Sequence, residues 1–405
     1  AIDVPRPAIE LAESTRRLGS MLAEIYRRNP DSFRLFCPDE TNRNRLGEVF
    51  EVSDRGFAEQ VTSEDTKISV DGRVMEVLSE HNCHGWLEGY TLTGRHGMFA
   101  TYEAFAMVSA SQTIQHSKWL EEAVHLPWRQ KVPSLNVLLT STAWRNDHNG
   151  FSHQGPGLIQ VAITHRGEVT RVYLPPDANC LLSVADHCLR SESYVNLIVI
   201  DKQPQMQWLD MDAAIEHCTR GAGVWDWAGT DDGERDPDVV MACAGDAVTL
   251  ETVAAAQILK ERLPQLKVRV VNVVDLMGLA RRRDHPHGLT DLQFRELFTD
   301  STDVVFAFHG FPGAIHQLVH GRPDADRFHV RGFIEEGTTT TPFDMTVKNK
   351  VSRYHLVMDA INNAARTPAG AVELSEWCRG KLFEHHDYVI EHLEDMPEVR
   401  NWRLG

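Results

Sequence analysis

The sequence lacks the signals of a membrane protein and of a disulfide-stabilised secreted protein. No stretch approaches the roughly 18 consecutive apolar residues that a membrane span requires. The seven cysteines are odd in number and form no Cys-x-x-Cys pair, which favours reduced thiols. We therefore expect a cytoplasmic protein without a membrane partner.

Positive charge is also scarce. Lys and Arg total 41 against 58 Asp and Glu, which gives a formal net charge of −17. Such a chain is repelled by phosphate backbones, so broad binding to nucleic acid is excluded. A local basic pocket for a phosphorylated substrate is still compatible with this composition.

Common nucleotide and hydrolase motifs are missing as well. The segment Gly221-Ala222-Gly223 lacks the third glycine of a dinucleotide fingerprint, and residues 310–313 lack the Lys-Ser/Thr of a phosphate loop. The chain has no Gly-x-Ser-x-Gly motif. His81, Cys83 and His84 match no common zinc spacing, so we expect no metal site here.

The length points to two domains, because 405 residues exceed what one hydrophobic core normally supports. We expect a linker and leading helix at 1–30, a first domain at 31–225, a second linker at 226–237 and a second domain at 238–405. The first residues, Ala-Ile-Asp-Val-Pro-Arg-Pro, lack an initiator Met and an apolar signal segment. The chain is therefore expected to begin inside a longer polypeptide.

Apolar runs and amphipathic segments alternate along the chain. We expect strands at 32–36, 74–78, 98–101, 135–139, 169–173, 195–200, 239–244, 268–274, 304–308 and 330–333. We expect helices at 8–28, from 80, at 103–124, 181–189 and 247–262, and from 354 onward. This alternation predicts an α/β fold with two domains, each a mainly parallel sheet flanked by helices.

The segment 141–157 is the most informative polar stretch. It follows an apolar run and contains acid, base, amide and hydroxyl groups together with three glycines that allow tight turns. A functional site is one interpretation. The other is a loop whose polar groups satisfy one another.

Several segments together carry a specific family resemblance. They are Ser79 to Tyr90, Leu92 to Gly97, Tyr102 to Phe105, Trp144 to Gln154, Lys202-Gln203-Pro204 and Thr338 to Met345. Between about residues 31 and 360 the chain resembles the xylulose 5-phosphate/fructose 6-phosphate phosphoketolases, which are thiamine-diphosphate enzymes related to transketolase. The resemblance covers only the pyrimidine-binding domain and the transketolase-like C-terminal domain.

The resemblance implies a reaction and a cofactor. Phosphoketolases cleave xylulose 5-phosphate or fructose 6-phosphate with inorganic phosphate, giving acetyl phosphate and an aldose phosphate. The diphosphate of the cofactor is held through Mg²⁺ by a Gly-Asp-Gly motif and a later Asn, and that motif is missing here. We expect thiamine diphosphate to meet this chain on its pyrimidine side, and Mg²⁺ to sit in a diphosphate-binding domain on another segment or chain.

The resemblance also implies roles for individual residues. Glu80 is the carboxylate that hydrogen-bonds the aminopyrimidine ring of the cofactor. His153 and Asn149 face the two-carbon unit, with Tyr102 nearby. The other interpretations are that Glu80 stabilises the first turn of a helix, that Tyr102 is a core residue and that His153 caps its loop.

Phosphate binding is implied for His148, Arg45 and Lys202. Lys202 at a solvated strand end, and Arg45 paired with Asp39 or Glu40, are the alternatives.

Two positions depart from the family pattern. Arg43 replaces a serine, and Asn146 replaces a glutamine in the segment Trp-Arg-Gln-Asp-His. We expect Arg43 to add attraction for a sugar phosphate or another anion, and Asn146, one methylene shorter, to change a catalytic hydrogen bond.

We expect a homodimer or larger homo-oligomer that acts on a sugar phosphate and inorganic phosphate, and an isolated chain that is inactive without the diphosphate-binding domain. A non-catalytic partner or scaffold subunit that keeps the fold is one alternative. A transketolase-like two-carbon transferase is the other.

Overall fold

The computed structural model describes residues 1–38, 41–150, 155–164 and 168–404, and leaves the side chains of His148 and Asn149 undescribed. The chain forms two compact units. The first comprises residues 1–5, 10–142 and 157–215, and the second comprises residues 6–9, 143–156 and 216–405. The segment 143–156 therefore leaves the first unit and groups with the second.

The first unit is built on an eight-stranded sheet in the order β4-β3-β5-β2-β6-β7-β9-β8, and its recorded strand pairs are all parallel. The strands are β2 (Phe33–Cys37), β3 (Arg55–Gly56), β4 (Ile68–Ser69), β5 (Val74–Glu76), β6 (His96–Tyr102), β7 (Leu135–Thr140), β8 (Thr170–Tyr173) and β9 (Val195–Val199). Strands β7, β8 and β9 are buried along their whole length. Burial on both sides follows, because helices cover both faces of such a sheet.

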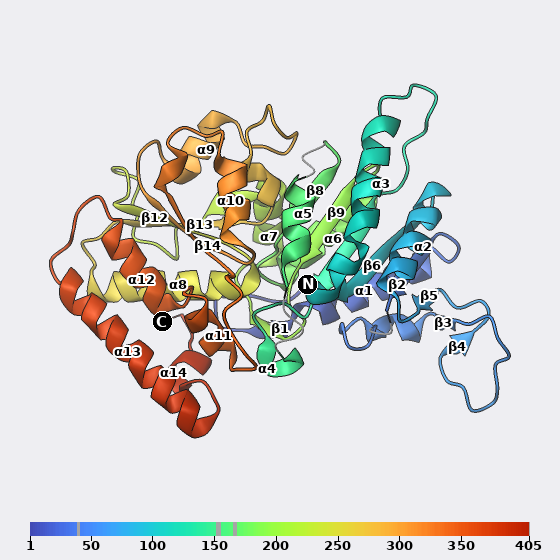
Figure 1. The fold of residues 1–405 in the computed structure, drawn as a ribbon, viewed down its shortest axis with the longest axis horizontal. Helices are drawn as coiled ribbons and strands as arrows, with labels where there is room; N and C mark the ends of the chain where they lie inside the picture. Colours follow the sequence, from blue (N-terminus) through green and yellow to red (C-terminus); the bar gives the residue numbers. More distant parts are fainter. Residues whose placement is uncertain (39–40, 151–154, 165–167, 405) are drawn as a thin grey trace. The chain divides into compact units, whose positions relative to one another are not determined.

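Helices cover both faces of this sheet (Figure 1). On one face lie α2 (Glu80–Leu92), η2 (Glu103–Ser109), α3 (Ala110–Ala123) and α5 (Gly157–Thr164), and on the other lie α1 (Ser14–Arg28) and α6 (Ala178–Arg190). Right-handed connections between parallel strands account for this division. A 3-10 segment, η1 (Gly47–Glu51), packs on α1, and a separate two-stranded antiparallel sheet joins β1 (Leu11–Glu13) to β10 (Pro204–Met206).

The second unit contains a five-stranded sheet in the order β11-β13-β12-β14-β15. Its strands are β11 (Ala222–Val224), β12 (Val239–Ala244), β13 (Val268–Val273), β14 (Val304–Phe308) and β15 (Phe328–Arg331). All pairs are parallel except β11 with β13, which is antiparallel. The result is a mainly parallel sheet with one antiparallel edge strand.

The helices of the second unit also occupy both faces of its sheet (Figure 1). They are α8 (Asp246–Arg262) and α12 (Arg353–Asn362) on one side, and α9 (Asp291–Phe298) and α10 (Pro312–Val319) on the other. The remaining elements are α4 (Asn146–Asn149), η4 (Leu276–Leu279), η5 (Ala325–Arg327), α11 (Pro342–Lys348), α13 (Ala371–His392) and α14 (Pro397–Arg400). Helix α7 (Met211–Arg220) carries the chain from the first unit into the second.

The expected α/β class is confirmed, with local differences. The helix expected at 8–28 begins at Ser14, because residues 11–13 pair with β10 instead. The expected strand 330–333 is displaced to Phe328–Arg331, where it pairs with β14. Residues 226–237, expected as a linker, follow β11 and lie within the second unit; the domain limits given above stay a prediction.

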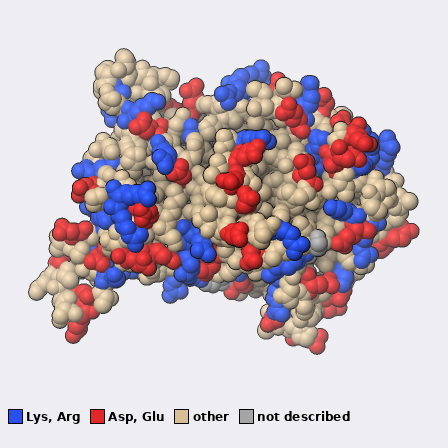
Figure 2. Space-filling view, turned by 180° about the vertical axis from the view of Figure 1, so that it is seen from behind, with Lys and Arg blue, Asp and Glu red and all other residues tan. Residues whose placement is uncertain are grey.

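The surface is mixed in charge. On the face seen in Figure 2, acidic and basic side chains are interspersed rather than gathered into one broad basic area. Among the described residues, no helix is both long and apolar enough to cross a membrane.

Candidate functional site

The expected functional residues of the first unit follow the carboxyl ends of its parallel strands. Glu80 comes shortly after β5, Tyr102 ends β6 and Lys202 comes three residues after β9. Arg43 and Arg45 lie in the segment after β2. Since all these strands run the same way, their carboxyl ends share one edge of the sheet, which is where open α/β sheets bind ligands.

Glu80 is the first residue of α2 and is partly exposed. The hydroxyl oxygen of Ser79 caps the helix by accepting a hydrogen bond from the Asn82 backbone N–H at 3.3 Å. Capping is therefore performed by the serine, while Glu80 lies in the first turn, where a carboxylate also interacts favourably with the helix dipole.

Apolar side chains are exposed just before α2 and on the neighbouring segment η2. Leu78 is 80% exposed, and Met107 and Val108 are each 43% exposed on η2, which packs against α2.

Tyr102 and Lys202 are in direct contact. The Lys202 ammonium nitrogen lies 3.8 Å from the centroid of the Tyr102 ring. Lys202 is fully buried and Tyr102 is 8% exposed. A solvated strand end, the alternative interpretation of Lys202, is thus excluded, and the buried ammonium is stabilised in part by the π face of the ring.

Asp201 is an organising residue that the sequence patterns did not reveal. Its carboxylate is fully buried and accepts hydrogen bonds from the backbone N–H and the hydroxyl of Thr142, at 2.8 and 2.9 Å, and from the Gln203 N–H at 2.7 Å. These bonds tie the segment after β7 to the segment after β9. They also fix the backbone on either side of Lys202.

The segment after β2 is held from two sides. The buried Asn44 accepts a hydrogen bond from the Thr140 hydroxyl. Arg45 has a positive φ of 62° and donates from Nε to Glu13 at 2.8 Å. Arg45 therefore pairs with Glu13; its alternative partners, Asp39 and Glu40, lie outside the described residues.

Arg43 is exposed. Arg43 lies in the turn 41–45, in which Thr41 and Asn44 are buried.

The segment 143–150 packs on residues of the second unit. The Trp144 indole N–H donates to the His309 carbonyl at 3.0 Å. Asn146 is 1% exposed, and its Nδ2 lies 3.1 Å from the Met345 sulfur. Among the described residues no hydrogen-bond partner is found for Asn146 Oδ1.

The other candidate residues of this segment are only partly placed. The backbone of His148 and Asn149 forms α4, while their side chains and the whole of His153 lie outside the described residues. The structure thus brings Tyr102 and Lys202 together, and it groups Asn146, His148 and Asn149 on one short helix.

Of the residues His81, Cys83 and His84 on α2, His81 is exposed, while Cys83 and His84 belong to the core. His84 is fully buried, with Nε2 at 3.0 Å from the Thr113 hydroxyl and Nδ1 at 2.7 Å from a Glu88 carboxylate oxygen. His116 lies on the other side of Glu88, with its Nδ1 3.8 Å from Oε2. Burial lowers the pKa of His116 to about 4. Among the described residues no group of three or more His, Cys, Asp or Glu is arranged to hold a metal ion.

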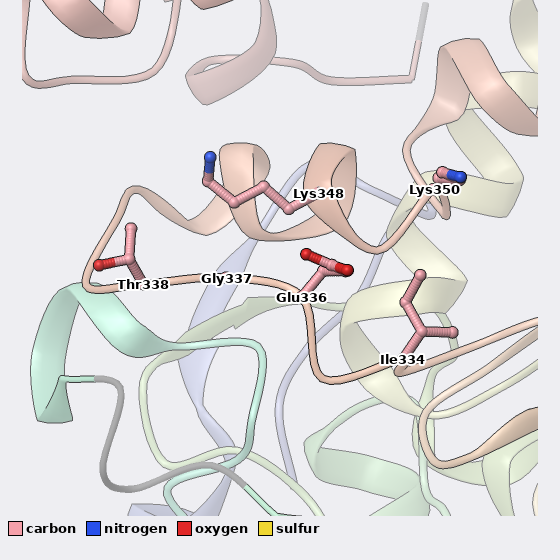
Figure 3. A pocket seen from close by; sticks show the side chains of 6 residues that line it. All are labelled: Ile334, Glu336, Gly337, Thr338, Lys348 and Lys350. Carbon is pink, nitrogen blue, oxygen red and sulfur yellow. The ribbon is translucent and has the colours of Figure 1, made fainter.

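An open pocket of about 370 Å³ lies in the second unit beside the Thr-rich segment 338–341. It is lined by Ile334, Glu336, Gly337, Thr338, Lys348 and Lys350 (Figure 3). In Figure 3 the two lysine side chains point in different directions, and Lys348 is ion-paired with Asp344 at 3.3 Å. The pocket has no converging pair of cations, so it is a weaker candidate than the strand ends of the first unit.

Solved structures identify the fold as that of transketolase. The transketolase of Pichia stipitis, solved in complex with sedoheptulose 7-phosphate, matches with a TM-score of 0.66 at 14% identity, over 90% of this chain and 47% of that one. A split-gene transketolase, described as an inactive β4 tetramer, matches with a TM-score of 0.54 at 16% identity over 87% of this chain and 97% of that one.

The family follows from closer relatives. Residues 16–191 match the model of D-xylulose 5-phosphate/D-fructose 6-phosphate phosphoketolase, and residues 202–404 match that of the XFP C-terminal domain. The chain belongs to this phosphoketolase family. It is 54% identical over 404 residues to a probable phosphoketolase of Gloeobacter violaceus and 55% identical over 405 residues to one of Rhodopseudomonas palustris. The two matches include 99% and 100% of this chain, respectively, but only 51% of the length of each relative.

Proposed function

We propose that this chain supplies the pyrimidine-binding and C-terminal domains of a phosphoketolase. The reaction is the cleavage of xylulose 5-phosphate and/or fructose 6-phosphate by inorganic phosphate, giving acetyl phosphate and an aldose phosphate. The observation that carries the proposal is the succession of Glu80, Tyr102 and Lys202 along one edge of a parallel sheet, in a chain that matches phosphoketolases over its whole length.

The residues present fit the pyrimidine half of thiamine diphosphate. An aminopyrimidine ring needs a carboxylate for its ring nitrogen and apolar surface for its faces; Glu80 follows the exposed Leu78 by two residues, and α2 packs on η2, which carries exposed apolar side chains. The cofactor, when bound, supplies the electron sink that lets a bond next to a carbonyl carbon break. Glu80 would hold the ring and would be the group that exchanges a proton with its nitrogen.

The remaining roles concern phosphate and proton transfer. The buried Lys202 carries a charge that water screens poorly, so it attracts a phosphate group more strongly than a surface lysine does. Tyr102 holds that ammonium in place with its ring face. Asn146, His148, Asn149 and His153 are proposed to contact the sugar phosphate and the two-carbon unit, with Arg43 and Arg45 adding positive charge.

The residues that bind the diphosphate of the cofactor are proposed to lie on another segment or chain. This chain spans about half the length of the curated relatives it matches. A diphosphate-binding domain is needed to hold Mg²⁺ and the diphosphate of the cofactor. The split-gene transketolase supports this view, because a chain of similar extent is described there as inactive. We further propose a cytoplasmic homodimer or larger homo-oligomer.

Complementation tests the proposal. The chain is co-expressed with the N-terminal half of the Gloeobacter violaceus relative, and acetyl phosphate is assayed with each sugar phosphate. Formation of acetyl phosphate by the assembly, and none by either half or by a Glu80→Gln assembly, is the expected result. Two-carbon transfer to an aldose acceptor without phosphorolysis would instead indicate a transketolase-like activity, and a stable inactive assembly would indicate a scaffold.

Cofactor binding gives a second test. Because the diphosphate site is proposed to lie elsewhere, calorimetry should detect no micromolar binding of thiamine diphosphate to the isolated chain. Tight binding by the chain alone would contradict the proposed division of the site.

A further inference from the structure

The second sheet has its own position where an α/β sheet usually binds a ligand. From β12 the chain moves through α8 to β13 on one side, and later crosses to β14 on the other side of β12. The crevice outside the carboxyl ends of β12 and β14 is therefore the topological switch point of this sheet. The residues directly after these strands are Gly245 and His309.

The indole of Trp144 packs at the end of β14. It is 1% exposed and donates its N–H to the His309 carbonyl at 3.0 Å. The ring meets His309 and Phe333 edge to face, with centroids 6.4 and 5.9 Å apart. Phe333 follows β15, the next strand of the sheet. A place that commonly receives a ligand is here filled by a side chain of the protein itself.

The contacts beyond Trp144 extend this attachment. Asn146 is buried against the Met345 sulfur, and Gly150 approaches the Thr339 hydroxyl so closely that an added Cβ would lie 3.4 Å from it. Met345 lies in α11, and Thr339 lies in the segment that leads into this helix. The short helix α4 therefore packs on α11 within the second unit. It has only four residues, so its own hydrogen bonds stabilise it little.

We propose that Trp144 is a positioning residue: its seat at the end of β14 sets the place of α4, and through α4 the place of His148 and Asn149. The effect of Trp144 on the position of α4 does not depend on the proposed function. The expected effect on catalysis does rest on it. The seat of Trp144 gives the C-terminal α/β unit a task, which is to hold a segment of the reaction machinery rather than to bind a ligand of its own.

Two variants separate the parts of the contact. Trp144→Phe keeps aromatic packing and removes the N–H bond to His309, while Trp144→Leu removes both. Trp225→Phe is the matched control, since Trp225 is an equally buried tryptophan of the same unit that stacks on Trp227 instead. Each variant is made in the chain alone and in the assembly with the diphosphate-binding half.

Hydrogen exchange of the chain alone decides the structural claim. The Gly150 amide, which donates to the Asn146 carbonyl at 3.0 Å, should exchange at least about ten times faster in Trp144→Leu, with a smaller change in Trp144→Phe and none in Trp225→Phe. Protection in the β12 and β14 strands should stay unchanged. Unaltered exchange at Gly150 in Trp144→Leu would overturn the inference, whether or not the assembly is active.

Kinetics of the assembly decide the catalytic claim. A displacement of about an ångström can cost on the order of 100-fold in rate, so we expect kcat to fall roughly 100-fold in Trp144→Leu and roughly 10-fold in Trp144→Phe. KM for the sugar phosphate should also rise, because His148, which is proposed to contact that substrate, lies on α4 and is displaced with it. If the wild-type assembly is active and Trp144→Leu leaves its kcat unchanged, the positioning role is refuted. If the wild-type assembly is inactive, the proposed function is refuted, and hydrogen exchange at Gly150 still tests whether Trp144 positions α4.

Discussion

The ammonium nitrogen of Lys202 lies 3.8 Å from the centroid of the Tyr102 ring, at the carboxyl edge of the first sheet. A buried ammonium above an aromatic face is an energetic coupling between two side chains that are 100 positions apart in the sequence.

That coupling is measurable by a double-mutant cycle. Lys202→Met and Tyr102→Leu, singly and together, should give an interaction free energy of about 1–2 kcal/mol in urea unfolding. Tyr102→Phe should keep most of it, because the ring face is retained. Additive effects of the two substitutions would show that the ring does not stabilise the cation.

Removal of the Asp201 carboxylate should destabilise the first unit strongly. Asp201→Ala leaves the Thr142 and Gln203 donors without their buried partner, so the free energy of unfolding should fall by about 3 kcal/mol or more. Asp210→Ala is the control, because that exposed carboxylate accepts a single N–H bond from Ala213 and should cost only about 1 kcal/mol. Equal losses in both variants would argue against the clamp.

Gly245 is required by its surroundings. Its φ is +118°, and a Cβ there would lie 2.6 Å from the His309 Cβ. Gly245→Ala should therefore lower the melting temperature of the second unit and cost about 2 kcal/mol or more. Gly313→Ala, in a helix with open space around it, should be neutral or slightly stabilising. A wild-type melting temperature for Gly245→Ala would contradict this.

Stability should depend on pH through His116. Burial lowers its pKa to about 4, against about 6.5 in an unfolded chain. Between these values the unfolded chain binds a proton that the folded chain does not, so stability is full above pH 6.5 and falls as the pH drops toward 4. The change approaches about 3 kcal/mol.

Urea unfolding of the wild type and of His116→Leu at a series of pH values checks this dependence. The free energy of unfolding should change less steeply with pH in the variant than in the wild type. The pH dependence that remains includes the contribution of His355, because burial also lowers its pKa to about 4. If the free energy of unfolding depends on pH equally in the two proteins, His116 does not contribute to the pH dependence.

Arg43 should strengthen binding of an anion. In the active assembly, Arg43→Ser should weaken affinity for the sugar phosphate or for inorganic phosphate by about 1 kcal/mol, or roughly five-fold, and the loss should shrink at high salt. Arg282→Ser, an exposed arginine of the second unit, is the control. Unaltered affinity for both anions would reject a role for Arg43.

Much of the fold follows from local patterns in the sequence. The uninterrupted apolar run 239–244 predicts a strand buried on both faces, and β12 is buried throughout. The helix expected from Glu80 begins at that residue. By contrast, β1 was missed because Leu11 also fits the helical period that continues into α1, and only its partner β10 decides between the two.

The candidate residues divide in the same way. Residue types and motif order pointed to Glu80, Tyr102 and Lys202, and the alternation of strands and helices placed them at strand ends. The burial of Lys202, the Glu13 partner of Arg45 and the clamp at Asp201 were beyond reach, because each depends on groups brought together from distant parts of the chain.

The sequence by itself determined the α/β class, the family and the chemical inventory of the candidate site, because hydrophobic period and motif order are local properties. Only the tertiary structure decided which groups meet. Arg45 and Glu13 are 32 positions apart, Thr142 and Asp201 are 59 apart, and Trp144 and His309 are 165 apart. No local pattern encodes such pairings, since they arise from the packing of strands and helices on one another.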